Sequence, residues 1–229
     1  MRFEVTKLFS SWLTSLNSQI SVVAVVGGTS GDPEVGVIKS LYPNAEIHYF
    51  GIDNPRNDKN FHRLDLDTDH AHISTKFDLV LCSQVLEHLW NLDNAFNELR
   101  AFLNLGGYLW LNCPASNMAH GSPHYYSAGY AAEYLVKNLE HRGFEIEISR
   151  NIGSKRYYFS THILRQWLTE AEIQSPIFKY NFQPGSFLGI SRKYLRELPG
   201  RILSLVYSNL VTTDIDYATE AVVLAKLTK

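Results

Sequence analysis

The chain of 229 residues has little cysteine, no large charge excess and no long apolar run. Its two cysteines cannot form a disulfide framework. A formal net charge of −2 provides no basic field that would hold nucleic acid, so we expect no polynucleotide partner. No apolar run approaches the ~20 residues that span a bilayer, and the N-terminus lacks the pattern of a signal peptide. These absences favour a cytoplasmic protein.

The two cysteines, Cys82 and Cys113, end apolar segments that we expect to be neighbouring strands. Free cysteine is usually buried and inert, so two small buried thiols in a reducing compartment are the first interpretation. A redox pair is the alternative.

The rest of the composition suits a folded enzyme or binding domain. Hydrophobic residues make up 45% and charged residues 19% of the chain, which allows a sizeable core. We expect a single domain over residues 1–229, elaborated by an insertion at residues 149–216. That insertion of about seventy residues is too long for a turn and carries a predicted helix at residues 161–171.

Strand-like and helix-like segments alternate along the chain. Apolar runs predict seven strands, at residues 22–26, 45–52, 61–66, 77–82, 108–113, 144–148 and 217–227. Helical spacing predicts helices at residues 5–16, 33–42, 94–103 and 130–142. Such alternation predicts an α/β fold: a doubly wound, mostly parallel seven-stranded sheet with helices on both faces and a helical insertion before the last strand.

The most informative segment is residues 77–114, FDLVLCSQVLEHLWNLDNAFNELRAFLNLGGYLWLNCP. It predicts a buried strand, a polar turn, a helix stopped by Gly106-Gly107, and a second strand. The polar pair Glu87-His88 follows the first of these strands, at the end where open parallel sheets bind their ligands.

A second polar and glycine-rich turn follows the first strand. Gly27, Gly28 and Gly31 would let the backbone approach a ligand closely. Asp53, at the end of the second strand, can accept both hydroxyls of a ribose. These features suit a nicotinamide cofactor and S-adenosylmethionine equally, although the turn is not the G-x-G-x-x-G of dinucleotide-binding proteins.

The order of these segments resembles the class I S-adenosylmethionine-dependent methyltransferases, over about residues 22–148 and the last strand. The Glu87-His88 pair, followed by the E-L-x-x-x-L-x-x-G-G helix, is the most specific match, and Gly143-Phe144 before the sixth strand is another. The resemblance implies S-adenosyl-L-methionine as cofactor. It also implies a set of cofactor-binding residues: Gly27, Gly28, Gly31, Asp53, Asp65, Leu66, Ser83, Gln84 and Glu87.

One position departs from the family pattern. The family usually has an acid two residues before the first glycine, where this chain has Val25. Asp32 could replace it from across the turn. If it does not, a non-catalytic binding or scaffold relative is one alternative. A nicotinamide-dependent oxidoreductase, which the glycine turn and Asp53 would also suit, is the other.

Methyl transfer from a sulfonium depends mainly on positioning, and a hydroxyl acceptor also needs a base. Histidine is suited to that role near neutral pH. The candidates are His88, His120 and His124, of which the last two lie in a loop dense in His and Tyr. Loop histidines that only form hydrogen bonds are the alternative. We expect methyl transfer to a hydroxyl of a small molecule or a glycan.

Two other segments invite interpretation. The polar residues at 67–72 match no metal-ligand spacing, so no metal site is expected. Residues 191–210 combine four basic side chains with apolar ones. They suit an amphipathic helix pair packed on the sheet, or a docking face for a membrane surface or an acidic carrier.

Overall fold

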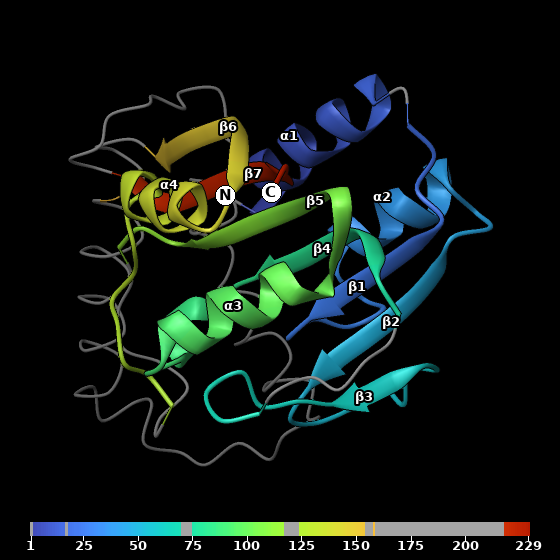
Figure 1. Cartoon of the computed structure of the whole chain (residues 1–229), viewed down its shortest axis with the longest axis horizontal. Coiled ribbons are helices and arrows are strands. Elements are labelled where there is room, and N and C mark those ends of the chain that lie inside the picture. Colours follow the sequence, from blue (N-terminus) through green and yellow to red (C-terminus); the bar gives the residue numbers. More distant parts are fainter. Residues whose placement is uncertain (1, 17, 70–74, 117–123, 154–157, 159–217) are drawn as a thin grey trace, which may run out of the picture.

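A computed structural model describes residues 2–16, 18–69, 75–116, 124–153, 158 and 218–229. These residues form a single sheet covered by helices on both faces (Figure 1). Among them, no helix has the length and apolar character required to cross a membrane. Most of the predicted insertion, including residues 161–171 and 191–210, lies outside the described residues.

The sheet contains seven strands in the order β3-β2-β1-β4-β5-β7-β6. Their bounds are β1 Val22–Val26, β2 Glu46–Gly51, β3 Phe61–Arg63, β4 Phe77–Ser83, β5 Leu103–Pro114, β6 Phe144–Gly153 and β7 Ala218–Leu227. β7 pairs antiparallel with both β5 and β6, whereas the pairs among β1 to β5 are parallel. The sheet is thus mixed: the predicted strand count is confirmed, and the antiparallel insertion of β7 between β5 and β6 was not predicted.

The helices divide between the two faces of the sheet. They are α1 Arg2–Ser15, α2 Pro33–Leu41, α3 Leu92–Phe102 and α4 Ala132–His141, with a short 3₁₀ helix, η1, at Leu86–His88. Figure 1 shows α3 and α4 in front of the sheet and α1 and α2 behind it. Side chains alternate along β1 accordingly, so that Val23 and Val25 join the core under α1 and α2, while Ala24 and Val26 join the core under α3 and α4.

Several element boundaries differ from the sequence prediction. α3 ends at Phe102, one residue before its predicted end, and β5 begins at Leu103 and not at Tyr108, because Leu103 is extended (φ −81°, ψ 145°) and already pairs with Phe77. The predicted strand at residues 61–66 stops at Arg63. The predicted strand at residues 144–148 continues to Gly153, because its antiparallel pairing with β7 extends that far.

Candidate functional site

The strand order changes direction between β1 and β4, and the turns that follow these two strands meet at the same edge of the sheet. Open α/β sheets bind ligands at such a switch point. Gly27 has φ +71°, and its backbone N–H donates to the carbonyl of Phe50 at 2.7 Å. A Cβ on Gly27 would lie 2.3 Å from a methyl group of Val85, so only glycine fits between the two turns. The structure therefore brings the predicted glycine turn against the segment that precedes Glu87.

The space beside Gly28 holds the side chains of both Asp32 and Val25. A Cβ on Gly28 would lie 2.5 Å from Asp32 Oδ2 and 2.8 Å from Val25 Cγ1. Asp32 Oδ2 also accepts a hydrogen bond from the backbone N–H of Thr29 at 2.9 Å. Val25 itself is buried in the apolar core under α1 and α2. The carboxylate of Asp32, at the start of α2, therefore orders the glycine turn. It lies next to Val25, the position where the family usually has an acid.

The loop after β2 folds over the outer part of the same turn. Asp53 is exposed there. Asp58 accepts a hydrogen bond from the Ser30 N–H at 3.0 Å, and a Cβ on Gly31 would lie 2.4 Å from the guanidinium carbon of Arg56. Although burial would raise the pKa of Asp58, hydrogen bonding to Ser30 and the charge of Arg56 lower it. Arg56 and Asp58 were not predicted, because the sequence shows only a polar loop around them.

The segment after β3 is tied to the segment after β4. Leu66 is buried, so its side chain belongs to the core, and its carbonyl accepts from Asn94 Nδ2 at 2.9 Å. Asp65 is half-buried and accepts from the Asp67 N–H at 3.0 Å. Asp67 Oδ1 in turn accepts from the backbone N–H groups of Trp90 (3.0 Å) and Asn91 (2.9 Å).

A hydrogen-bonded network connects the turn after β4 with β5 and β7. Gln84 has φ +59°, uncommon for a residue other than glycine. Its Nε2 donates to Asn112 Oδ1 at 2.9 Å and to Glu220 Oε2 at 2.8 Å. Asn112 Nδ2 donates to the same Glu220 oxygen at 3.1 Å. Burial raises the pKa of Glu220 to about 7, and the nearby Glu87 also raises it, against the two amide hydrogen bonds.

Asn112 and Glu220 escaped the sequence prediction because each stands in an apolar run that predicts a buried strand. The one feature of the sequence that could have identified them is a polar side chain within an otherwise apolar strand. Ser83 lies beside this network, and its buried hydroxyl has no hydrogen-bond partner among the described residues.

The Glu87-His88 pair lies in η1, directly after Val85. Glu87 is fully buried, and His88 Nε2 lies 3.8 Å from its Oε1. His88 Nδ1 hydrogen-bonds the carbonyl of His124. Because a carbonyl only accepts, Nδ1 must carry a proton, which leaves Nε2 as the acceptor nitrogen of the neutral ring. The ring of Tyr125 lies 6.2 Å from that of His88, and burial together with Glu87 raises the tyrosine pKa.

The three predicted histidines have different surroundings. His88 contacts the buried Glu87, whereas the side chain of His124 is exposed and this residue meets His88 through its backbone. His120 lies outside the described residues.

Cys82 and Cys113 are both buried free thiols on the neighbouring strands β4 and β5. Burial raises the pKa of both, and Glu87 raises each further, so both thiols are protonated near neutral pH. This confirms that both cysteines are buried free thiols. Among the described residues no cluster of His, Cys, Asp and Glu could hold a metal ion; His70 and His72 lie outside them.

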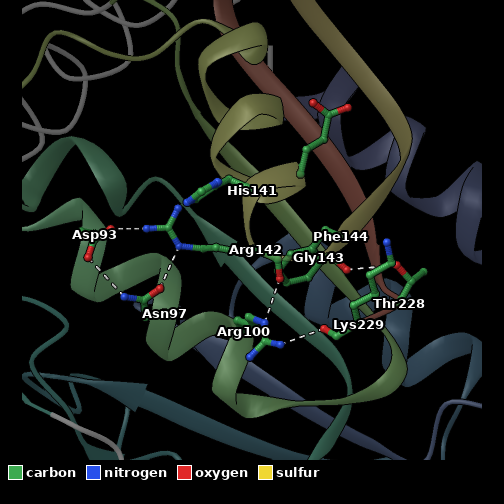
Figure 2. Close-up of a pocket in the computed structure, with 10 residues that line it drawn as sticks. Asp93, Asn97, Arg100, His141, Arg142, Gly143, Phe144, Thr228 and Lys229 are labelled. Atoms are coloured by element: carbon green, nitrogen blue, oxygen red, sulfur yellow. Dashed lines mark hydrogen bonds and ion pairs between the residues drawn. The ribbon is translucent and has the colours of Figure 1, made fainter.

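A surface pocket of about 720 Å³ lies at the amino-terminal ends of the parallel strands, away from the site, beside the start of β6 and the end of β7. Figure 2 shows that its arginines are engaged within the protein. Arg100 donates to the carbonyls of Arg142 and Lys229, each at 2.8 Å. Arg142 pairs with Asp93 and donates to Asn97 at 2.9 Å. The pocket therefore lies between α3, the end of α4 and the two residues after β7, and has no part in the site at the carboxyl ends of the strands.

Comparison with known proteins gives a consistent picture. A family model described as a methyltransferase domain matches residues 26–174. The sequence matches no curated protein. Similar solved structures include the (4+2) cyclase SpnF, with 18% identity, a TM-score of 0.57 and coverage of 98% of this chain and 80% of that one.

Two further solved structures are named as methyltransferases. One is an O-methyltransferase of a trans-AT polyketide synthase from Brevibacillus brevis, in complex with S-adenosyl-L-homocysteine (13% identity, TM-score 0.58, 98% of this chain, 72% of that one). The other is coclaurine N-methyltransferase, bound to N-methylheliamine and S-adenosylhomocysteine (12% identity, TM-score 0.55, 97% of this chain, 72% of that one). At these identities the likeness concerns the fold.

Proposed function

The chain belongs to the class I S-adenosylmethionine-dependent methyltransferase family, and we propose that it transfers a methyl group to a small molecule or a glycan, at a hydroxyl. The observation that carries the proposal is the contact of Gly27 with Val85, which joins the glycine turn to the segment of Glu87 and His88. The predicted cofactor turn and the predicted base His88 therefore lie at the same ends of the strands, which supports the proposal.

The residues at this edge fit the cofactor that the family uses. Gly28 and Gly31 leave room for the side chains of Asp32 and Arg56, which lie where a Cβ would stand, and Asp53 offers an exposed carboxylate that suits ribose hydroxyls. The buried Ser83 hydroxyl, without a partner among the described residues, is a further candidate contact. S-adenosylmethionine would supply a methyl group activated by its positive sulfur.

The histidine pair supports a hydroxyl acceptor. The bond from His88 Nδ1 to the His124 carbonyl fixes the ring and its tautomer, so that Nε2 can accept a proton. Glu87 Oε1 lies 3.8 Å from that nitrogen. O- and N-methyltransferases both occur among the similar structures, so the hydroxyl preference depends on this base.

The test is titration calorimetry of the full chain with S-adenosylmethionine, S-adenosylhomocysteine and NAD. We expect binding of the first two only, and a loss of about 10-fold or more in affinity for Asp53→Ala, because a charge-assisted hydrogen bond to the ribose is lost. Binding to NAD alone would overturn the proposal. Binding to none of the three would favour the non-catalytic alternative that Val25 suggests.

A further inference from the structure

The Glu220 carboxylate is a charged group in a strand that is otherwise almost entirely apolar. We propose that Glu220 lies on the acceptor side of the methyl-transfer site and takes the proton that a hydroxyl acceptor loses. This inference rests on the proposed function and makes Glu220, in place of His88, the residue that takes the single proton of the acceptor.

The network around Glu220 holds one carboxylate oxygen, Oε2, by hydrogen bonds, and its hydrogen bonds do not reach the other oxygen, Oε1. Gln84 Nε2 and Asn112 Nδ2 both donate to Oε2, at 2.8 and 3.1 Å. Asn112 Oδ1 accepts from Gln84, so the orientation of the Asn112 amide is determined by the network. No donor from the described residues reaches Oε1 of Glu220. The carboxylate is therefore held on one side and can accept a proton on the other.

The position of this network is the carboxyl edge of β4 and β5. Glu220 is opposite Pro114, the last residue of β5. Gln84 directly follows β4, and its backbone N–H donates to the Asn112 carbonyl at 2.7 Å. The left-handed backbone of Gln84 is unfavourable for a residue other than glycine, and such conformations gather at functional sites. The network thus borders the same turn that leads to Glu87 and His88.

A purely structural role does not require a charge at this position. Glutamine has the same shape, and its side-chain oxygen could accept both amide hydrogen bonds without the cost of burying a carboxylate. Among the described residues, Glu87 is the charged group that acts on Glu220, and its repulsion raises the pKa of Glu220 further above its ordinary value. A carboxyl group whose pKa is near 7 is well matched to proton transfer at neutral pH.

The proposed step balances in atoms and charge. The acceptor oxygen forms a bond to the methyl carbon, and the methyl–sulfur bond breaks with its electron pair remaining on sulfur. The acceptor's proton moves to Glu220, which becomes neutral and later releases the proton to water.

The experiment compares the wild type with Glu220→Gln, and with Glu133→Gln as a matched control. Glu133 also accepts hydrogen bonds from an asparagine amide, that of Asn151 at 2.9 and 3.0 Å, but it belongs to α4 and not to the network of Glu220. Phenol is the probe for a hydroxyl acceptor, and methoxybenzene, which lacks the hydroxyl proton, is its comparison. Both are titrated in the presence of S-adenosylhomocysteine.

We expect the wild type and Glu133→Gln to bind phenol about 10-fold or more tightly than methoxybenzene, because only phenol donates to a carboxylate. In Glu220→Gln this preference falls below about 3-fold, while affinity for S-adenosylhomocysteine is unchanged. A preference retained in Glu220→Gln, or absent from the wild type, overturns the inference. Failure of the wild type to bind S-adenosylhomocysteine would instead overturn the proposed function.

A second measurement needs no acceptor. Because the folded state raises the pKa of Glu220, its protonated form is favoured and stability falls as pH rises from about 4.5 to about 7. Glu220→Gln should remove this fall in thermal unfolding temperature, and Glu133→Gln should keep it. If Glu220→Gln fails to fold, Glu220→Asp, which keeps the charge and shortens the side chain, replaces it in both measurements. We expect this variant to keep a phenol preference above about 3-fold and to keep the fall in stability with rising pH. Loss of either property overturns the inference.

Discussion

At the scale of single residues, Gly27 shows how closely the two turns of the site approach each other. Gly27→Ala places a Cβ 2.3 Å from Val85 at a φ of +71°, where a side chain costs about 1–2 kcal/mol before any clash. We expect the glycine turn to shift and the affinity for S-adenosylmethionine to fall by at least about 10-fold, measured by calorimetry.

The control is Gly36→Ala, because nothing lies within 4 Å of a Cβ at this position in α2. This substitution should raise stability by about 0.5–1 kcal/mol through the higher helix propensity of alanine, with unchanged affinity. Equal affinity in the two variants would contradict the role given to Gly27.

A histidine pair outside the site gives the fold a pH dependence. His48 Nδ1 lies 2.9 Å from His62 Nε2, and His48 Nε2 lies 2.9 Å from Glu46 Oε1. Burial, and then the neighbouring His48, lowers the pKa of His62. As pH falls below about 6.5, the unfolded chain takes up a proton that the folded chain resists, so stability is lost in that range.

We therefore expect His62→Gln to flatten the fall in unfolding free energy below pH 6.5. The wild-type slope from this group is no steeper than about 1.4 kcal/mol per pH unit, the limit for one proton. Glu220 acts with the opposite sign between about pH 4.5 and 7, so the comparison uses urea unfolding of proteins that differ only at His62. An unchanged slope would show that His62 is not responsible.

At the scale of elements, Asp67 joins the segment after β3 to the start of α3. Its carboxylate accepts from the N–H groups of Trp90 and Asn91, and Asn91 is the N-cap of α3. Asp67→Ala should cost about 1.5–3 kcal/mol in urea unfolding, the range for hydrogen bonds to a charged group. Asp67→Asn keeps an acceptor oxygen and should cost about half as much. Equal losses in both variants would show that the charge of Asp67, and not hydrogen bonding as such, carries the effect.

The sequence predicted elements best where hydrophobic pattern alone determines them. The prediction for β1 matches at both ends, because five consecutive apolar residues are bounded by a serine and a glycine. It was wrong at the junction of α3 and β5, where the helix passes into the strand at Leu103 without a connecting turn. Pairing with Phe77 decides that boundary, and tertiary contacts of this kind leave no local mark in the sequence.

The same distinction applies to the site. Glycines and acids at strand ends could be assigned to the site because strand topology brings those ends together. Asn112 and Glu220 could not, because their neighbours are apolar, and their partners come from strands more than a hundred residues apart. The roles predicted for the nine cofactor residues and three histidines remain predictions.

At the scale of the whole molecule, two apolar cores share one sheet. Leu99 of α3 is fully buried on one side, and Ile38 of α2 is fully buried on the other. No buried cluster contains both, since the strands of the sheet separate them. The layers should nevertheless unfold together, because each strand contributes alternate side chains to both cores.

This arrangement predicts additive losses of stability within a single transition. Ile38→Val should cost about 0.5–1.5 kcal/mol and Leu99→Ala about 2–5 kcal/mol, as typical for deletion of buried methyl groups. The double variant should equal the sum within about 0.5 kcal/mol, because the sheet keeps the two sites from sharing partners. Urea unfolding followed by both tryptophan fluorescence and circular dichroism checks this. Two results would contradict a single cooperative domain: fluorescence and circular dichroism transitions that do not coincide, or a Leu99→Ala variant in which one of the two transitions is unshifted. Either would mean that the α3 side unfolds independently of the α1 side.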